Sequence, residues 1–359
     1  MFASKIGSIL PRPERSAALT TDYAAAFRRG ATALVAACAV GGCLAAAPAG
    51  AGPFRSQQQM LAVAGDPIPT AAAAAGYRME TLAVDQLNPR TVDSKLTYGP
   101  GFQMYYFNFE GMGPNSSLTT FNQDGSATIA ALGSGWWAYG YFLTSAGASR
   151  GGPGFRGTAF GGGGYFEATF AFNSALVNTA NGWPAWWSEG LEHMISKGDN
   201  WTGQRPNYEH FIEPDFFEYD TGSGKAYGGN MHDWYGVFNS TCAGNSYCGY
   251  QLPYSTVVRN VPSNTDFTQY HRYGFLWKPA TATTKGALSY YFDGVQVGAT
   301  TTYSKFTNQP PAPNASTPWS FGVIDQDHLV LIIGTAPPVP MKIKSIQVWQ
   351  PSSVNNLHN

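Results

Sequence analysis

The chain has 359 residues and a formal net charge of −1, with 12% charged residues, 14% aromatic residues and 42 glycines. This length accommodates one large domain or two ordinary ones. Because the net charge is small and lysine and arginine do not cluster, we expect no nucleic-acid partner. Few charges, many aromatic residues and abundant glycine favour an exported all-β protein over a helical one.

The first 51 residues differ in composition from the rest of the chain. Arg28 and Arg29 precede an apolar run rich in alanine and glycine, which ends in small residues at 49–51. This order is typical of a signal peptide, and the run is short for the alternative, a membrane anchor. The letters VGGC, ending at Cys43, also resemble a lipoprotein cleavage site. We therefore expect a secreted or periplasmic protein, or one lipid-anchored through Cys43, with no transmembrane domain in the mature chain.

Two cysteines, Cys242 and Cys248, lie outside this leader and are separated by five residues. In an exported protein such a pair most often forms a disulfide that closes a loop. A structural metal site needs more ligands at suitable spacing, so we expect no metal and no other cofactor, with structural calcium left open.

Residues 52–95 show little periodicity, and we expect a linker or an N-terminal arm there. From 96 to 351 short apolar or alternating runs, such as FQMYYFNF and GYFEATFAF, are separated by glycine, proline, asparagine and serine. Each run has the length and composition of a strand. Strands without intervening helices predict one antiparallel β-sandwich domain, followed by a tail at 352–359.

Two local features refine this prediction. The stretch LSYYFDGVQV contains Asp293 and Gly294, a pair that favours a tight hairpin turn. The nearest approach to helical periodicity is a short stretch within 186–197.

The stretch HFIEPDFFEYD places four acids in eleven positions among aromatic residues. On a regular strand Glu213 and Asp215 share a face, whereas Glu218 points to the other. A β-bulge at Phe216 and Phe217 would return Glu218 to the face of the first two acids. Three carboxyls in a row repel one another, so at least one should keep its proton to high pH. The alternatives are a solvated strand edge or a calcium-binding acidic loop.

Paired carboxyl groups of this kind suit glycoside hydrolysis. One carboxylate attacks the anomeric carbon, and a protonated carboxyl donates its proton to the leaving oxygen. An acid between the two can hold them in different ionisation states. Spacing alone does not say which glutamate is the nucleophile.

Seven stretches, in order along the chain, resemble glycoside hydrolase family sixteen. EPDFFE is similar to the bulged signature E-x-D-x-x-E, GYFEATFAF to the strand GYFEARIKL, and GWPAWWSEG to TWPAFWLLG. Weaker matches are NMHDWYG, DFTQYHRYGFLWKP, LSYYFDGVQV and IKSIQVWQ. Pro214 departs from the family, which usually has an aliphatic residue at that position. Proline lacks the N–H that a sheet ladder requires.

This resemblance implies a concanavalin-like jelly-roll sandwich with a concave substrate cleft. It also implies a retaining, endo-acting hydrolase of β-linked polysaccharide, of the laminarinase, agarase and carrageenase branch, with β-1,3-glucan favoured as substrate. The roles it implies are nucleophile for Glu213, general acid/base for Glu218 and assisting carboxylate for Asp215. Rival functions are a non-catalytic carbohydrate-binding module and a transglycosylase with the same residues. We expect a monomer whose partner is the polysaccharide.

Four further residues are candidates for binding the sugar. Trp183 and Trp187 share a strand face, and indole rings stack on the C–H faces of sugars, whereas Trp186 should point into the core. His232 and Trp234 follow in NMHDWYG, where the resemblance places a histidine near the catalytic centre. Each could instead be a core residue.

Overall fold

The computed structural model describes residues 68–107, 116–130, 141–148, 155–180, 182–195, 208–219, 224–237, 250–251, 254–306, 321–336 and 339–359. The predicted signal peptide, the cysteine pair Cys242 and Cys248, and the proline-rich stretch 308–318 lie outside these residues. Among the described residues no helix has the length and apolarity needed to cross a membrane.

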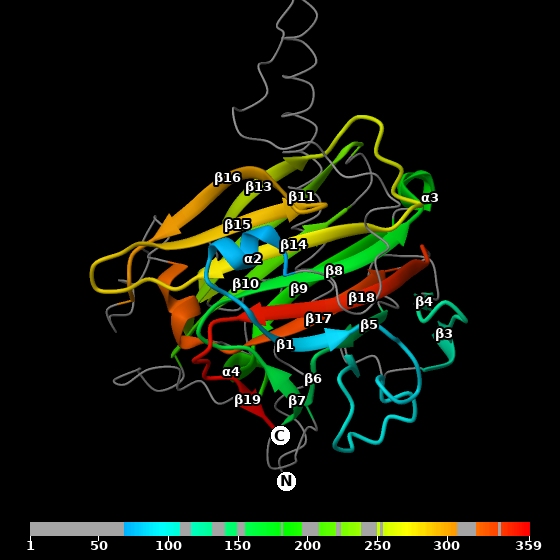
Figure 1. The fold of residues 1–359 in the computed structure, drawn as a ribbon, viewed down its shortest axis with the longest axis horizontal. Helices are drawn as coiled ribbons and strands as arrows, with labels where there is room; N and C mark the ends of the chain where they lie inside the picture. Colours follow the sequence, from blue (N-terminus) through cyan, green and yellow to red (C-terminus); the bar gives the residue numbers. More distant parts are fainter. Residues whose placement is uncertain are drawn as a thin grey trace, which may run out of the picture.

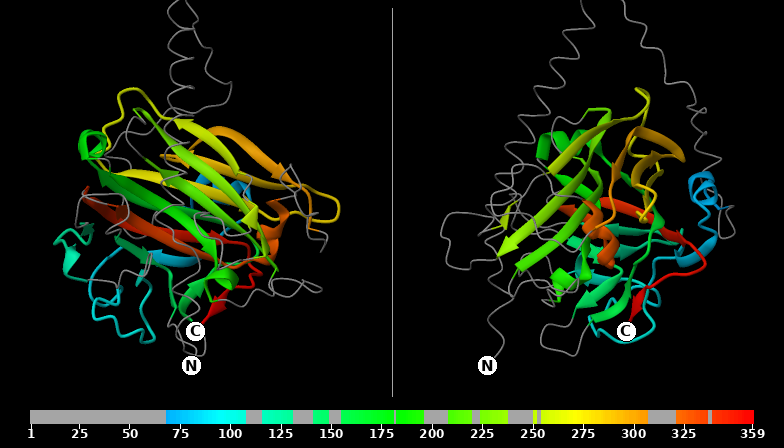
Figure 2. Two further views of the ribbon diagram at one scale, coloured as in Figure 1. Left: turned by 180° about the vertical axis from the view of Figure 1, so that it is seen from behind. Right: turned by 90° about the vertical axis from the view of Figure 1, so that its left-hand side faces the viewer.

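Two eight-stranded sheets stack face to face, which confirms the predicted antiparallel β-sandwich (Figures 1 and 2). Sheet I has the order β16 (Val295–Tyr303), β15 (Gly286–Phe292), β14 (His271–Lys278), β8 (Gly164–Phe172), β18 (Met341–Gln350), β4 (Ala127–Ile129) and β3 (Thr119–Phe121), with β1 (Met79–Val84) also paired to β18. Sheet II has the order β12 (Tyr250–Gln251), β11 (Ala226–Val237), β10 (Tyr208–Glu218), β9 (Trp183–Gly190), β17 (Leu329–Ala336), β5 (Tyr141–Thr144) and β2 (Tyr105–Phe107), with β13 (Tyr254–Asn260) also paired to β11.

Smaller elements surround the sandwich. The strands β6 (Ala146–Ala148), β7 (Phe155–Ala159) and β19 (Leu357–His358) form a three-stranded sheet. The helices are α2 (Thr70–Ala74), α3 (Ser174–Ala180) and α4 (Leu191–Met194), with 3₁₀ turns η3 (Ser116–Leu118) and η4 (Phe321–Gln326). The helix expected within 186–197 is therefore confined to α4, because the tryptophan-rich residues before it belong to β9.

The core between the two sheets follows the period-two alternation of the strands. In β8, Phe166 and Phe170 point into this core, and Trp186 of β9 is fully buried there, as predicted. Phe216 of β10 stacks on Phe275 of β14 across the sheets, with ring centroids 4.4 Å apart. Aromatic side chains of β8, β9, β10 and β14 thus hold the two layers together.

The segment predicted as a linker or arm, 52–95, belongs to the sandwich over its described part. β1 pairs with β18 in antiparallel register, from Met79 opposite Gln350 to Val84 opposite Ile346. The short helix α2 packs with Tyr165, Leu276 and Trp349 on the outer face of sheet I (Figure 2). The sequence did not predict α2, because a five-residue helix composed almost wholly of alanine has no amphipathic period.

The predicted hairpin turn is present between β15 and β16. Phe292 pairs with Val295, so Asp293 and Gly294 form a two-residue loop. Their φ values are +51° and +79°, the positive angles that the favoured hairpin turn requires at both positions.

Candidate active site

The acidic strand β10 lies between β11 and β9 in sheet II and contains the predicted bulge. Against β11, Asp215 pairs with Asn230 and Glu218 with Gly228, so three steps on β10 match two on its neighbour. Against β9, Asp215 pairs with Trp187 and Phe217 with Trp186, so two steps match one. One extra residue therefore lies between Asp215 and Phe217.

The bulge decides which way each side chain points. Phe216 and Phe217 are consecutive, yet both are in the core, with 1% and 0% of their surface exposed. Glu218 is consequently returned to the face of Asp215, the face turned away from the core. Phe216 and Phe217 bury large apolar rings, so the hydrophobic effect stabilises the bulged form over a regular strand.

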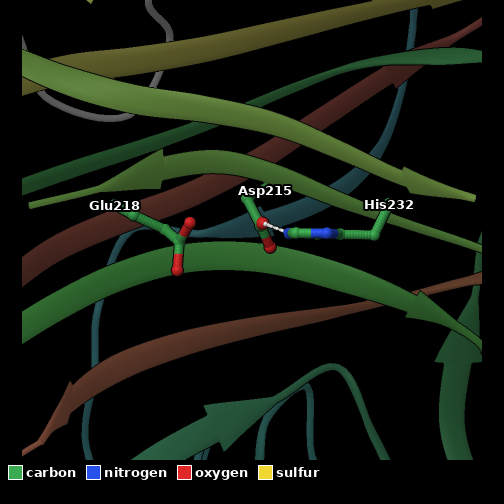
Figure 3. Close-up of side chains that lie close together, drawn as sticks. All are labelled: Asp215, Glu218 and His232. Carbon is green, nitrogen blue, oxygen red and sulfur yellow. Dashed lines mark ion pairs between the residues drawn. The ribbon is translucent and has the colours of Figure 1, made fainter. Parts of the chain in front are cut away.

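Asp215 lies between the two glutamates along β10 and contacts Glu218 and His232. Its Oδ2 is 2.9 Å from Nε2 of His232, which lies on the neighbouring strand β11. Figure 3 shows the Asp215 carboxyl between Glu218 and His232. Asp215 and His232 are 3% and 4% exposed, whereas Glu213 and Glu218 are half-buried. The row thus offers two reachable glutamates beside one sequestered aspartate.

Two donors hold the carboxyl group of Glu218. The indole N–H of Trp183 donates to its Oε1 at 2.9 Å, and the amide of Asn230 donates to its Oε2. Asn230 is fully buried, and its backbone carbonyl accepts a hydrogen bond from the Tyr290 hydroxyl at 3.1 Å. Sequence reasoning missed Asn230, although alternation from His232 and Trp234 places it on the same strand face.

Glu213 has a comparable indole partner. The N–H of Trp234 donates to its Oε2 at 2.8 Å, and Trp234 is 1% exposed. Trp183 and Trp234, predicted as sugar platforms, thus hydrogen-bond to the two glutamates of the row. Such donors fix the orientation of the carboxylate that accepts from them.

Trp187 also lies on this face of sheet II, as predicted, because it pairs with Asp215. Its ring packs in an apolar cluster with Phe155, Val330 and Ile332 and contacts Phe107 edge-on at 6.1 Å. With 3% of its surface exposed, Trp187 presents little area for stacking on a sugar in this structure.

Pro214 lies where the pairing between β10 and β9 stops. The register to β9 covers Asp215 to Glu218, and towards the start of the strand the N–H of Ile212 donates to the side chain of Asp327 at 3.3 Å. A proline fits at such a point because its missing N–H interrupts no ladder with β9.

Burial raises the pKa of both Asp215 and Glu218. Desolvation raises the pKa of Glu218 well above its usual value, and the charge of Asp215 raises it further, while His232 and the Trp183 hydrogen bond oppose this. Desolvation and the charge of Glu213 also raise the pKa of Asp215, and a hydrogen bond from Glu218 lowers it. Glu218 therefore retains its proton at a pH where an exposed glutamate is ionised, as a general acid must.

Comparison with solved structures gives several similar folds. They include the laminarinase catalytic domain of Thermotoga maritima MSB8 (TM-score 0.43, 14% identity, 77% of this chain and 99% of that one) and endo-1,3-beta-glucanase from Streptomyces sioyaensis (TM-score 0.44, 17% identity, 80% and 100%). Endo-beta-1,3-glucanase from Pyrococcus furiosus has a TM-score of 0.41 and 14% identity, over 69% of this chain and 88% of that one.

The chain resembles laminarinase catalytic domains in fold. No family model matches the sequence, and no curated protein matches it. The likeness concerns the fold alone.

Two acids of the row, together with His232, also have the composition of a cation site. Ligand atoms of Asp215, Glu218 and His232 all lie within 4.8 Å of one another, the sole such group in the part of the chain that the structure describes. A divalent cation would need Glu218 and Asp215 ionised together, whereas burial favours a retained proton. Removal of metal ions with a chelator distinguishes a bound cation from a retained proton at these residues.

We predict that Trp183→Phe keeps the ring but removes the N–H donor to Glu218. The pKa of Glu218 then rises, because the hydrogen bond from Trp183 lowers it in the wild-type protein. In a glycoside hydrolase with Glu218 as general acid, Glu218 must be protonated to act. The alkaline limb of the pH–rate profile is then expected at higher pH in the variant, with kcat at the optimum about threefold to tenfold lower. Full pH profiles of kcat on a soluble β-glucan check this; an alkaline limb that stays in place contradicts it.

Proposed function

We propose that this chain is a retaining, endo-acting glycoside hydrolase that cleaves internal linkages of a β-linked polysaccharide, with β-1,3-glucan as the favoured substrate. The observation that carries this proposal is the bulge, which gathers Glu213, Asp215 and Glu218 on one face and keeps the phenylalanines between them in the core. Two half-buried glutamates of unlike surroundings suit the two roles of double displacement.

In the first step the carboxylate of Glu213 attacks the anomeric carbon, and Glu218 gives its proton to the departing glycosidic oxygen. In the second step the Glu218 carboxylate takes a proton from water, whose oxygen displaces Glu213 from the sugar. Trp234 orients the attacking carboxylate and Trp183 the acid through their N–H groups. Asp215, hydrogen-bonded to Glu218 and paired with His232, raises the proton affinity of the acid.

A panel of soluble β-1,3-glucan, mixed-linkage β-glucan and sulfate-free galactan tests this function. We expect release of a ladder of oligosaccharides early in the reaction, and newly formed reducing ends that are β-configured when followed by ¹H NMR. Initially α-configured ends would reject the retaining mechanism. Binding to a glucan in affinity electrophoresis without new reducing ends would favour a carbohydrate-binding module. Products longer than the substrate would favour a transglycosylase.

Chelation separates proton chemistry from cation chemistry at the same residues. We expect activity to be unchanged after dialysis against EDTA, because the proposed mechanism uses the proton of Glu218. Loss of activity that Ca²⁺ or Mg²⁺ restores, without a change in melting temperature, would assign Asp215, Glu218 and His232 to a catalytic cation.

Export is proposed with this function, because a polysaccharide of many residues is met outside the cytoplasm. The charged and apolar order of residues 1–51 supports a signal peptide, with lipidation of Cys43 as the alternative. Intact mass of the protein from a bacterial host that processes both signals would distinguish the two.

A further inference from the structure

A fourth acid lies on the same face of sheet II as the catalytic row. Glu189 follows Trp187 at the i+2 position of β9 and is 1% exposed. Its Oε1 is 3.5 Å from Nε2 of His193, four residues further on in α4. Its negative charge contributes to the raised pKa of Asp215. A buried carboxylate is costly without a partner, and the imidazole of His193 supplies one.

The ring of His193 begins a stack that leads to Glu213. His193 and Phe211 are nearly parallel, with ring centroids 3.8 Å apart and an interplanar angle of 11°. Phe211 and Trp234 are also nearly parallel, at 6.0 Å and 9°. The indole N–H of Trp234 then donates to Glu213 at 2.8 Å. Three stacked rings therefore connect the Glu189–His193 pair to the carboxylate proposed as nucleophile.

The local fold makes room for this stack. β10 pairs with β9 from Asp215 onwards, and before Pro214 it is held instead by the contact of Ile212 with Asp327. β9 ends at Gly190 and turns directly into α4, which brings His193 over Phe211 of β10. The imidazole of His193 and the indole of Trp234 are both neighbours of the Phe211 ring in this stack.

We propose that His193, held by Glu189, is a positioning residue for Glu213 and acts through the Phe211–Trp234 stack. The stack limits rotation of the indole and so keeps its N–H on the Glu213 carboxylate. This inference rests on the nucleophile role proposed for Glu213, although the positioning contact itself is measurable without turnover. A simpler role, in which the pair only fastens α4 to the end of β9, predicts no effect on Trp234.

The first test reads the Trp234 N–H directly. In a ¹H–¹⁵N TROSY spectrum the indole signal of Trp234, assigned through Trp234→Phe, should move in His193→Gln. Glutamine keeps a donor towards Glu189 but removes the ring. His193→Phe keeps a ring on Phe211 and should leave the signal near its wild-type position. The indole signal of Trp183, bonded to Glu218, is the internal reference and should not move in either variant.

The second test uses kinetics on β-1,3-glucan. We expect His193→Gln to lower kcat about tenfold with KM nearly unchanged, because a displaced nucleophile slows the chemical step more than it weakens binding. In the Trp234→Phe background the same substitution should change kcat by less than about twofold, since the connection to Glu213 is already broken. His328→Ala is the matched control, because His328 is also bonded to a glutamate, Glu192, but not to this stack.

The outcomes are distinguishable. An unmoved Trp234 signal in folded His193→Gln, additive kinetic effects, or equal effects of the Gln and Phe variants would each overturn the positioning role. If the wild-type protein cleaves none of the glucans but the Trp234 signal still moves in His193→Gln, the proposed function is rejected. The positioning of Trp234 by His193 then still holds. Should His193→Gln not fold, His193→Leu supplies the same loss of an aromatic ring in an apolar side chain.

Discussion

Replacing Glu213 with Gln is expected to lower kcat on β-1,3-glucan by on the order of 10⁴-fold or more, because an amide oxygen is a poor nucleophile towards the anomeric carbon. Glu218→Gln should lower it by roughly 10²- to 10⁴-fold, the usual contribution of a general acid. Reducing-end release under substrate saturation measures both. Both variants should fold, since the amide oxygen of each glutamine can accept from the Trp234 or Trp183 N–H.

The matched control is Glu80→Gln, a substitution of the same chemistry at an exposed position of β1. It should retain wild-type kcat. Azide distinguishes the two catalytic roles, because it attacks the anomeric carbon without needing a general base. Glu218→Ala with azide and an activated aryl glycoside should give a β-glycosyl azide, and Glu213→Ala an α-glycosyl azide. The reverse pattern would exchange the roles, and full activity in both glutamine variants would end the proposal.

Asp215→Asn is expected to reduce kcat by roughly 100-fold and to move the alkaline limb of the pH–rate profile to lower pH. After desolvation, the charge of Asp215 is the largest cause of the raised pKa of Glu218. Removing that charge lowers the pKa of Glu218, so the acid loses its proton at a lower pH and activity declines earlier as the pH rises. The direction is opposite to that expected for Trp183→Phe.

Profiles of kcat against pH for wild type, Asp215→Asn and Trp183→Phe check this pair of opposite shifts. Asp124→Asn is the control, because Asp124 is an exposed carboxylate that pairs with Lys342 away from the row. Its profile should overlay the wild type. An alkaline limb that moves upward in Asp215→Asn would mean that Asp215 does not act on Glu218 through its charge.

The sequence by itself determined the sandwich and the bulged acidic strand. Period-two alternation in stretches such as GYFEATFAF reports which residues of a strand are buried, because that period belongs to the extended backbone itself. The bulge was predictable for the same reason: Phe216 and Phe217 both require the core, and Glu218 must then leave it. The turn at Asp293 and Gly294 depends on backbone angles of two adjacent residues, which the sequence specifies locally.

The tertiary structure decided which neighbours each side chain meets. Sugar binding by Trp183 and Trp234 stays a prediction. Their N–H contacts with Glu218 and Glu213 were not predicted, because they follow from the register of β9 and β11 against β10. The register of β11 against β10 also places Asn230 in the site, opposite Asp215. The Ala-rich residues of α2 gave no periodic signal, and their place on sheet I follows from an aromatic surface built by distant strands. Contacts between strands far apart in sequence depend on packing of the whole sandwich, which no single stretch encodes.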